Sequence, residues 1–512
     1  MLNRRELLQS AAASGLLLVT NQLRAMAQAV PTIYPGGYVV HSEPLPEGKP
    51  TFVTVREGRL EGILGPDGIR YFRGIPYAAP PVGALRFKPP VAPATWTGTR
   101  QATQNPAAAI QSRDALESQN VALDTKTSED CLTLSITAPS TPGPHPVYLF
   151  IHGGGNTGGY QLDSRVKGAS FARDNVVFVT INYRLGALGF LELGKLMGSE
   201  YAGSGNNAIR DQIAALKWVR QNIAAFGGNP SQVTIGGQSA GAFNVCTLLA
   251  SPLSSGLYRG ALSQSGGGGT VITKDEALAS ADVLAAAFAE KGIKGRDILN
   301  APADAFIGVR GFRAAAHVDG DVLKAKPNAA AASGVNKDVA LLIGWDRDEI
   351  AGMGAGASGP LFERFKTLNP GLTDAQWERR FGAARTFGGP SWTLADSHAQ
   401  AGGATYVYYW TWAPDSGQNA GFAFHGAEMS YVFDNVDALK ARYIMPDAAI
   451  QARATAMHAL WVNFATTGIP TAPGLPEWPR WSTASRRYLN IDNGFKILEL
   501  PDADVALWRD PA

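Results

Sequence analysis

Two runs of consecutive apolar and β-branched residues constrain the fold more than any other feature of the chain. They span residues 146–151 (PVYLFI) and 176–182 (VVFVTIN). Strands that are buried on both faces carry such unbroken runs, whereas half-exposed strands alternate apolar with polar residues. A helical spacing of apolar residues follows at 206–225 and stops at Gly227 and Gly228. The order strand, strand, helix predicts a parallel sheet covered by helices on both faces.

Further segments extend this alternation towards the C-terminus. Strands are expected at 233–235, 339–343, 405–412 and 496–500. The alanine-rich stretch 270–320 has a helical pattern, and it is expected to form either part of a cap over the sheet or a connecting layer. Since no internal repeat and no long linker divides the chain, residues 28–512 are expected to form a single α/β domain with insertions.

The first 27 residues have the composition of an export signal. Arg4 and Arg5 precede an apolar run at 11–20, and residues 25–27 (AMA) offer a small-residue cleavage site. The arginine pair indicates a signal peptide of the twin-arginine type, and an ordinary N-terminal helix is the alternative. Because the apolar run is too short to cross a bilayer, we expect a periplasmic or secreted protein without a membrane span.

Charge and cysteine content exclude several classes of function. Without residues 1–27, the chain has 42 basic and 42 acidic residues, so it offers no excess positive charge to nucleic acid. The two cysteines, Cys131 and Cys246, are too few for a disulfide framework. Metal-binding spacings such as Cys-x-x-Cys and His-Glu-x-x-His do not occur in the sequence. We therefore expect no nucleic-acid partner, no metal and no cofactor.

Residues 234–241 (TIGGQSAG) contain a Gly-x-Ser-x-Gly core centred on Ser239. A short strand that ends at Gly236 precedes this serine and a helical pattern follows it, so Ser239 lies at a strand-to-helix turn. The flanking glycines leave space around such a turn, and the start of the next helix favours an anion there. A tight turn that needs its glycines for the backbone alone is the alternative. We interpret Ser239 as a nucleophile.

A serine hydroxyl needs a general base, and the chain order serine, acid, histidine leaves three of the seven histidines as candidates. His458 lies in a helical pattern, and His398 lies in a polar helical stretch. His425 lies in a glycine-flanked segment between strand-like and helical patterns, as loops that carry catalytic bases do. We therefore favour His425 as the base.

The acid that orients this base is expected after the strand at 339–343. Asp346, Asp348 and Glu349 follow that strand within a few positions. The residue pattern does not choose among these three carboxylates, because at least two of them are expected to be ordinary solvated or ion-paired groups.

An oxyanion site is expected at residues 152–155 (HGGG), directly after the strand at 146–151. Consecutive glycines allow backbone N–H groups to approach a ligand oxygen closely, and the N–H of Ala240 is the second expected donor. A flexible loop is the alternative interpretation of these glycines.

Taken together, these segments resemble the type B carboxylesterases, the family that includes the cholinesterases. The resemblance covers nearly all of the sequence after residue 27, and its most specific run is 226–241 (FGGNPSQVTIGGQSAG). Further matching segments are 71–90, 128–136, 152–155, 182–190, 211–241 and 425–433. The resemblance implies an α/β-hydrolase fold, with a mostly parallel central sheet, helices on both faces and cap insertions.

The resemblance also implies residue roles and a reaction. It implies a nucleophile, an acid, a base and three oxyanion donors, which are Ser239, Glu349, His425, Gly154, Gly155 and Ala240. Two structural ion pairs are implied as well, Arg86 with Glu129 and Arg184 with Asp211. The implied activity is hydrolysis of small-molecule carboxylic esters through an acyl-enzyme on Ser239. An amidase or carbamate hydrolase with the same residues, or a non-catalytic binding protein of this fold, are the alternatives.

Several positions depart from the family's pattern. Gln238 stands where a glutamate is usual before the nucleophile, and Ile350 stands where a glycine is usual after the acid. Asn156 replaces a common aromatic residue after HGGG, which predicts a more open or more polar acyl pocket. Cys131 matches a cysteine that the family often pairs, but no partner lies at 105–118, so a free thiol is expected. The 75 residues between the implied acid and base predict a reduced cap.

Overall fold

The computed structural model describes residues 45–509, except 120, 123 and 418, and the backbone of two short strands at Thr32–Ile33 and Val39–Val40. The predicted signal peptide at 1–27 lies outside the described residues, so export stays a prediction. No helix in the described part of the chain is both long and apolar enough to cross a bilayer.

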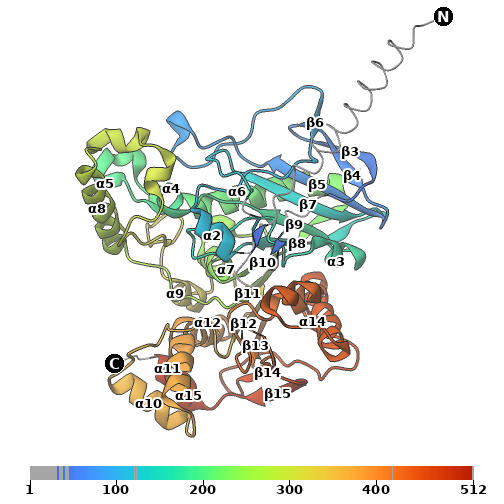
Figure 1. The fold of residues 1–512 in the computed structure, drawn as a ribbon, viewed down its shortest axis with the longest axis vertical. Helices are drawn as coiled ribbons and strands as arrows, with labels where there is room; N and C mark the ends of the chain where they lie inside the picture. The colour runs from blue at the N-terminus through green and yellow to red at the C-terminus, as the bar shows by residue number, and fades with distance from the viewer. Residues whose placement is uncertain are drawn as a thin grey trace, which may run out of the picture.

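One large sheet contains most of the strands, in the order β15-β14-β13-β12-β11-β10-β8-β9-β7-β5-β4-β3, with β6 beside β4 (Figure 1). The neighbours from β14 to β9 all run parallel, whereas the strands beyond either side of this block pair antiparallel, apart from β6. The strands of the sheet are β3 Lys49–Val55, β4 Gly58–Leu64, β5 Ile69–Pro76, β6 Thr99–Gln101, β7 Thr133–Pro139, β8 His145–Ile151, β9 Val177–Ile181, β10 Gly228–Gln238, β11 Gly260–Gln264, β12 Ala340–Asp346, β13 Thr405–Trp410, β14 Arg487–Ile491 and β15 Phe495–Glu499.

The predicted strands at 146–151, 176–182, 339–343 and 405–412 correspond to β8, β9, β12 and β13, which confirms the mostly parallel central sheet. The strand predicted at 496–500 is β15, which pairs antiparallel at the edge. The predicted strand end at Gly236 is wrong by two residues. Gly236, Gly237 and Gln238 continue to pair with β11, and the glycines also pair with β8, because a strand between two others retains its ladders without side chains.

Alternate residues of β8 enter two separate cores, as the period of a strand requires. Val147, Leu149 and Ile151 belong to the apolar cluster on one face of the sheet, whereas Tyr148 and Phe150 belong to the cluster on the other face. Helices lie on both sides of the parallel block, with α12 and α14 on opposite sides in Figure 1. The unbroken apolar run at 146–151 is therefore explained by burial on both faces.

The helices of the described residues vary widely in length. They are α2 Arg113–Ser118, α3 Gly168–Arg173, α4 Gly186–Phe190, α5 Gly194–Met197, α6 Asn207–Asn222, α7 Ala240–Ala250, α8 Lys274–Glu290, α9 Pro327–Ala332, α10 Pro360–Leu368, α11 Asp374–Ala383, α12 Gly389–Gln400, α13 Met429–Val432, α14 Ala448–Thr467 and α15 Asp502–Arg509. A π-helical segment, Ala384–Gly388, joins α11 to α12. Helix α6 corresponds to the helical pattern predicted at 206–225.

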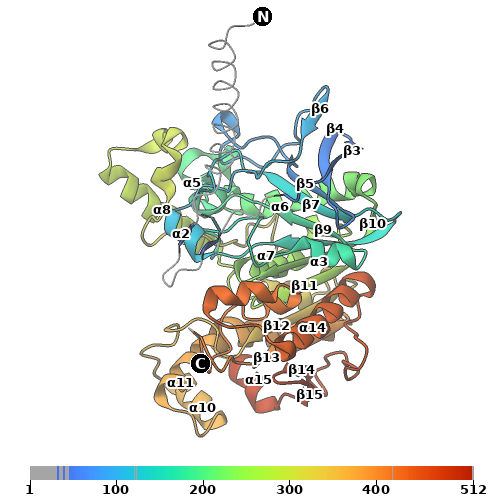
Figure 2. The same ribbon diagram turned by 45° about the vertical axis from the view of Figure 1, so that its right-hand side comes forward.

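The predicted helical stretch 270–320 contains α8, which packs on α4 and α5 through a separate apolar cluster around Leu188, Leu284 and Phe288. Figure 1 shows these three helices together at one end of the molecule, and Figure 2 shows α5 and α8 there. Helices α10 and α11 lie at the opposite end, beside α15. The insertions therefore form two distant groups of helices rather than one layer.

Both ion pairs implied by the resemblance are present. The guanidinium of Arg184 donates two hydrogen bonds to Asp211, of 2.8 and 2.6 Å, and both side chains are buried. Arg86 binds Glu129 through Nε at 2.7 Å and also donates to backbone carbonyls. Each charged side chain of the two ion pairs therefore has a partner that offsets the free-energy cost of its burial.

The two cysteines are buried and free, as expected for Cys131. Burial raises the pKa of the Cys246 thiol to about 11, and it also raises the pKa of Cys131. Both side chains therefore stay protonated at neutral pH and act as small core residues.

Candidate active site

Ser239 lies in the turn between β10 and α7, at the carboxyl end of the parallel block. Its φ of 57° and ψ of −125° fall in a region that residues with a Cβ atom rarely adopt. The backbone N–H of Ser239 donates to the carbonyl of Gln264 at the end of neighbouring β11, at 2.9 Å. This bond and the following helix hold the serine in its strained, half-buried position.

Two glycines explain how the chain turns so sharply here. A Cβ atom on Gly241 would lie 2.0 Å from the carbonyl oxygen of Ile151, and one on Gly237 would lie 2.5 Å from Gly241. Each position therefore admits only hydrogen, since real Cβ atoms do not approach backbone so closely. The start of α7 thus packs directly against the end of β8.

The HGGG segment lies beside the serine. A Cβ atom on Gly153 would lie 3.0 Å from Cβ of Ser239. Gly154 and Gly155 have φ angles of 106° and 63°, which turn the loop back over the site. None of the hydrogen bonds among the described residues uses the N–H of Gly154, Gly155 or Ala240. These three donors are therefore available to an oxygen atom bound near Ser239.

Glu349 and His425 are brought together from the loops after β12 and β13. The His425 Nδ1–H donates to the Glu349 carboxylate, and the backbone N–H of His425 donates to the carbonyl of Glu349 at 3.1 Å. Glu349 is buried, so solvent does not compete for its carboxylate, whereas the imidazole of His425 is partly exposed. The bond fixes the imidazole with an unprotonated Nε2, which is the tautomer that a general base needs. Phe387, in the π-helical segment, packs beside the imidazole with ring centroids 5.1 Å apart.

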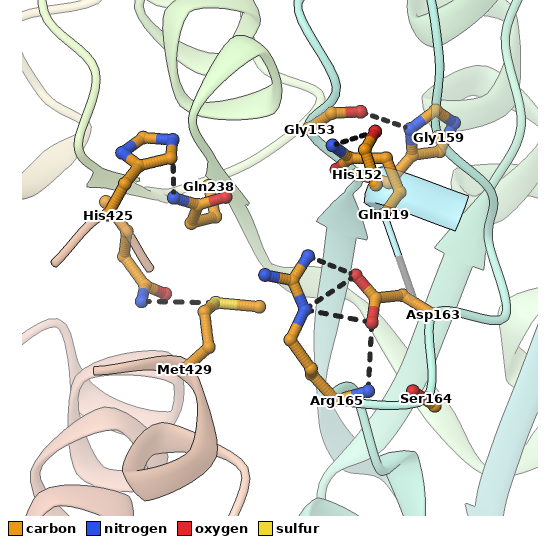
Figure 3. A network of polar contacts seen from close by, with 12 residues as sticks. Gln119, His152, Gly153, Gly159, Asp163, Ser164, Arg165, Gln238, His425 and Met429 are labelled. Carbon is orange, nitrogen blue, oxygen red and sulfur yellow. Dashed lines mark hydrogen bonds and ion pairs between the residues drawn. The ribbon is translucent and has the colours of Figure 1, made fainter. Parts of the chain in front are cut away.

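The imidazole Nε2 of His425 faces Gln238 rather than the serine hydroxyl. Nε2 of Gln238 donates to Nε2 of His425 at 3.2 Å, and Figure 3 shows the two side chains facing each other. No hydrogen bond among the described residues joins Ser239 Oγ to His425. The structure therefore brings acid and base into contact. Nε2 of the base is hydrogen-bonded to Gln238, the residue directly before the nucleophile.

The competing histidines have partners elsewhere. His398 is fully buried, with Nδ1 2.8 Å from Oγ1 of Thr405. His458 lies on α14, with Nδ1 2.7 Å from the carbonyl of Val432 and Nε2 3.0 Å from Asp174. Both therefore anchor helices, as the helical patterns around them favoured.

The competing carboxylates are also engaged. Asp348 accepts hydrogen bonds from Arg347, Arg380 and the backbone N–H of Ala423. It therefore clamps the loop after β12 to the loop after β13. This clamp supports the position of His425 without Asp348 entering the site.

A second buried acidic pair, Asp346 and Glu428, lies behind the Glu349–His425 contact. Asp346 accepts from the N–H of Gly426 at 2.9 Å, and Glu428 accepts from Gln264 at 2.9 Å. Burial, with Glu428 and Glu349 nearby, raises the pKa of Asp346 well above its ordinary value, and burial also raises the pKa of Glu428. Burial therefore favours the protonated form of this pair. Glu428 was not predicted as a site residue, since its only signal in the sequence is a carboxylate three residues after His425.

Asn156 does not offer its amide to the site. Its oxygen accepts from Asn244 at 3.0 Å and from the Tyr183 hydroxyl at 3.3 Å, and its nitrogen donates to the carbonyl of Ala314 at 3.2 Å. The φ angle of 59° is one that asparagine tolerates better than most residues. The asparagine therefore adds hydrogen bonds within the protein, so it does not itself make the acyl pocket more polar.

The described residues contain no group of three or more histidine, cysteine, aspartate or glutamate side chains arranged to hold a metal ion. His152, next to the glycines, stays neutral because burial lowers its pKa to about 4. Its Nδ1–H donates to the carbonyl of Gly153 at 2.9 Å.

Comparisons with known proteins identify the family of the chain. Residues 49–360 and 380–508 match the model of the carboxylesterase family. The para-nitrobenzyl esterase of Bacillus subtilis is 32% identical over 486 residues, covering 88% of this chain and 97% of the relative. The liver carboxylesterase of Sus scrofa is 30% identical over 539 residues, covering 90% of this chain and 93% of the relative. A solved carboxylesterase of Geobacillus stearothermophilus superposes with a TM-score of 0.80 at 32% identity, covering 90% of this chain and all of that one.

These similarities span nearly the whole described chain and come with the α/β-hydrolase arrangement of its sheet. The chain therefore belongs to the carboxylesterase family and is a carboxylic-ester hydrolase of the serine type.

Proposed function

We propose that the protein hydrolyses carboxylic esters through an acyl-enzyme on Ser239, with His425 as general base and Glu349 as the acid that orients it. The observation that carries the proposal is the contact of His425 Nδ1 with the buried Glu349, beside a strained serine. Family membership supports a serine hydrolase, and the hydrogen bonding supports these residues in particular.

The first half of the reaction forms the acyl-enzyme. Ser239 Oγ attacks the ester carbonyl and its proton passes to Nε2 of His425, while Glu349 stabilises the imidazolium. The N–H groups of Gly154, Gly155 and Ala240 stabilise the oxyanion that forms on the carbonyl oxygen. The bond from the carbonyl carbon to the alcohol oxygen then breaks, and Nε2 returns the proton to the leaving alcohol.

The second half repeats these steps with water. His425 takes a proton from the water as its oxygen attacks the acyl carbon, and the returning proton releases Ser239 and the carboxylic acid. In both halves Nε2 has to exchange the amide of Gln238 for a reacting hydroxyl. A rotation of the Gln238 side chain would release Nε2, because the amide is held to the imidazole by a single hydrogen bond.

The test is hydrolysis of 4-nitrophenyl acetate by the wild type and by Ser239→Ala, Glu349→Gln and Ser265→Ala. Ser239→Ala should fall to background, and Glu349→Gln should lose roughly 10³- to 10⁴-fold in kcat, because the imidazole loses its orienting charge. Ser265 is the matched control, since it also follows a strand at positive φ, with 54°. Ser265→Ala should retain turnover. Equal activity of Ser239→Ala and the wild type would refute the proposal.

A fluorophosphonate label provides a second readout that makes little demand on the acyl pocket. It should modify the wild type at Ser239 and leave Ser239→Ala unlabelled. Matched ester, amide and carbamate substrates test the alternative activities, because all three reactions would use the same residues. Faster turnover of the amide or carbamate would replace the esterase assignment, and no labelling of the folded wild type would favour a non-catalytic protein.

A further inference from the structure

A small pocket lies beside the loop that carries His425. It has a volume of about 20 Å³. Ten residues line it, and the argument uses Arg165, Phe424, Gly426 and Arg442. Phe424 and Gly426 flank the base on either side in the chain. Whatever binds in this pocket therefore contacts the backbone that positions His425.

Arg442 brings a positive charge to this pocket without a carboxylate partner among the described residues. Its guanidinium lies over the ring of Phe424, 4.8 Å from the centroid, and no hydrogen bond or ion pair of its side chain is recorded in the described part of the chain. Burial, with Arg165 nearby, lowers the pKa of Arg442 to about 10. The guanidinium therefore remains charged at neutral pH although its surroundings disfavour the charge.

Arg165 directs a second guanidinium towards the same region. Asp163 binds it through contacts of 3.1 and 2.6 Å, and Asn435 donates to the carbonyls of Ser164 and Arg165 at 2.9 and 3.2 Å. The loop is therefore held firmly from both sides. Beside the Arg165–Asp163 ion pair, the charge of Arg442 gives the pocket a positive character.

The pocket is linked to the reacting atoms through Gln238. The position that a Cβ atom on Gly426 would occupy lies 3.3 Å from Nε2 of Gln238 and 3.5 Å from Nη1 of Arg165. Gln238 in turn contacts Nε2 of His425. Figure 3 shows the guanidinium of Arg165 extending towards the Gln238 side of the site. The cationic pocket thus borders the imidazole edge at which the leaving alcohol receives its proton.

We propose that Arg442 and Arg165 bind a carboxylate carried by the alcohol part of the ester substrate. This inference rests on the proposed function, because the leaving oxygen takes its proton from Nε2 of His425 and the alcohol therefore extends along this edge. A volume of about 20 Å³ admits only a small end group, so the pocket takes an edge of the carboxylate and the rest of the alcohol lies outside it. Gln238 suits an anionic neighbour, because it is neutral where a glutamate would repel the carboxylate.

The test compares kcat/KM for the release of acetate from two matched esters. One is the acetate ester of 3-hydroxybenzoate, which is anionic. The other is the acetate ester of methyl 3-hydroxybenzoate, which is neutral. The kcat/KM for the anionic ester divided by that for the neutral ester should exceed one in the wild type. This ratio should fall towards one with added sodium chloride, because salt screens the attraction. Arg442→Met should lower the ratio roughly ten-fold or more, as expected for the loss of a charge-assisted contact. Arg442→Lys should retain most of the preference. Arg173→Met, which removes an exposed arginine outside the pocket, is the matched control and should leave the ratio unchanged.

Other outcomes overturn the inference in distinguishable ways. A ratio that is insensitive to Arg442→Met and to salt refutes the anion site while turnover of the neutral ester keeps the proposed function. A second pair, the 4-nitrophenyl monoester of glutaric acid and 4-nitrophenyl pentanoate, carries the charge on the acyl part. If Arg442→Met lowers the ratio of this pair and not of the first, the assignment to the alcohol is wrong. No turnover of any neutral ester, with no fluorophosphonate labelling, would refute the proposed function itself.

Discussion

Replacement of Ser239 by glycine should make the protein more stable while it abolishes turnover. The φ of 57° and ψ of −125° at Ser239 cost a residue with a Cβ atom roughly 1–3 kcal/mol. Glycine removes this cost, but it adds about 0.5–1 kcal/mol of backbone entropy to the unfolded chain. Since no hydrogen bond of the hydroxyl is recorded among the described residues, its loss costs little. The net expectation is a gain of about 1 kcal/mol.

The matched control is Ser239→Ala, which removes the same hydroxyl and keeps the Cβ atom. For roughly 460 folded residues the unfolding entropy is about 1 kcal/mol per kelvin, so Ser239→Gly should melt about 1 °C above Ser239→Ala. Differential scanning calorimetry at one scan rate, with replicate samples of both variants, measures this difference. A Tm of Ser239→Gly equal to or below that of Ser239→Ala would refute the inference that the turn stores strain.

Three further perturbations follow from the structure. Gly241→Ala should destabilise the fold by at least about 3 kcal/mol, because the new Cβ atom would meet backbone at 2.0 Å; soluble yield and Tm would show it. Asp211→Asn should cost about 3–5 kcal/mol, measured by urea unfolding, because it leaves the buried Arg184 without its charge partner. Burial lowers the pKa of His398 from 6.5 to about 4. Between pH 6.5 and 4, the unfolded chain therefore binds a proton at this histidine that the folded chain does not. The resulting stability, roughly 3 kcal/mol, is fully present above pH 6.5 and is lost as the pH falls towards 4; His398→Gln should flatten that part of the curve of unfolding free energy against pH.

Two of these variants have a matched control. Gly256→Ala is the control for Gly241→Ala, because no atom lies within 4 Å of its Cβ position and only its φ of 74° opposes alanine. Asp282→Asn, which breaks an exposed pair with Lys195, should cost less than about 1 kcal/mol. Equal losses for Asp211→Asn and Asp282→Asn, or an unchanged pH profile for His398→Gln, would contradict the burial arguments.

Local patterns predicted β8, β9, β10, β12 and β13 of the parallel block but missed β11 and β14, which lack unbroken apolar runs. The run at 146–151 is apolar at every position because both faces of β8 are covered, and both faces of β9 are covered in the same way. The antiparallel strands β3, β4 and β5 were not predicted, because the strands at this edge lie partly at the surface and lack unbroken apolar runs. The two-residue extension of β10 was missed because glycines have no side chain to indicate a strand.

The residues of the candidate site could likewise be predicted only in part from the sequence. The sequence alone was sufficient to indicate Ser239, the glycines at 154 and 155 and the segment of His425, because strand-to-helix turns and glycine runs are contiguous features. The residue pattern could not choose Glu349 from its neighbours, and the resemblance was needed for that choice. Tertiary structure decided which carboxylate reaches His425, because Asp348 turns to two arginines and Asp346 turns to Glu428.

Tertiary structure also decided the contacts that no local pattern encodes. Gln238 faces the imidazole, and Arg165 and Arg442, which are 277 positions apart, line one pocket. Local sequence determines strands, helices and turns because those depend on neighbours in the chain. The partners of a buried charge depend instead on which loops meet at the edge of the sheet, and only the folded chain specifies that.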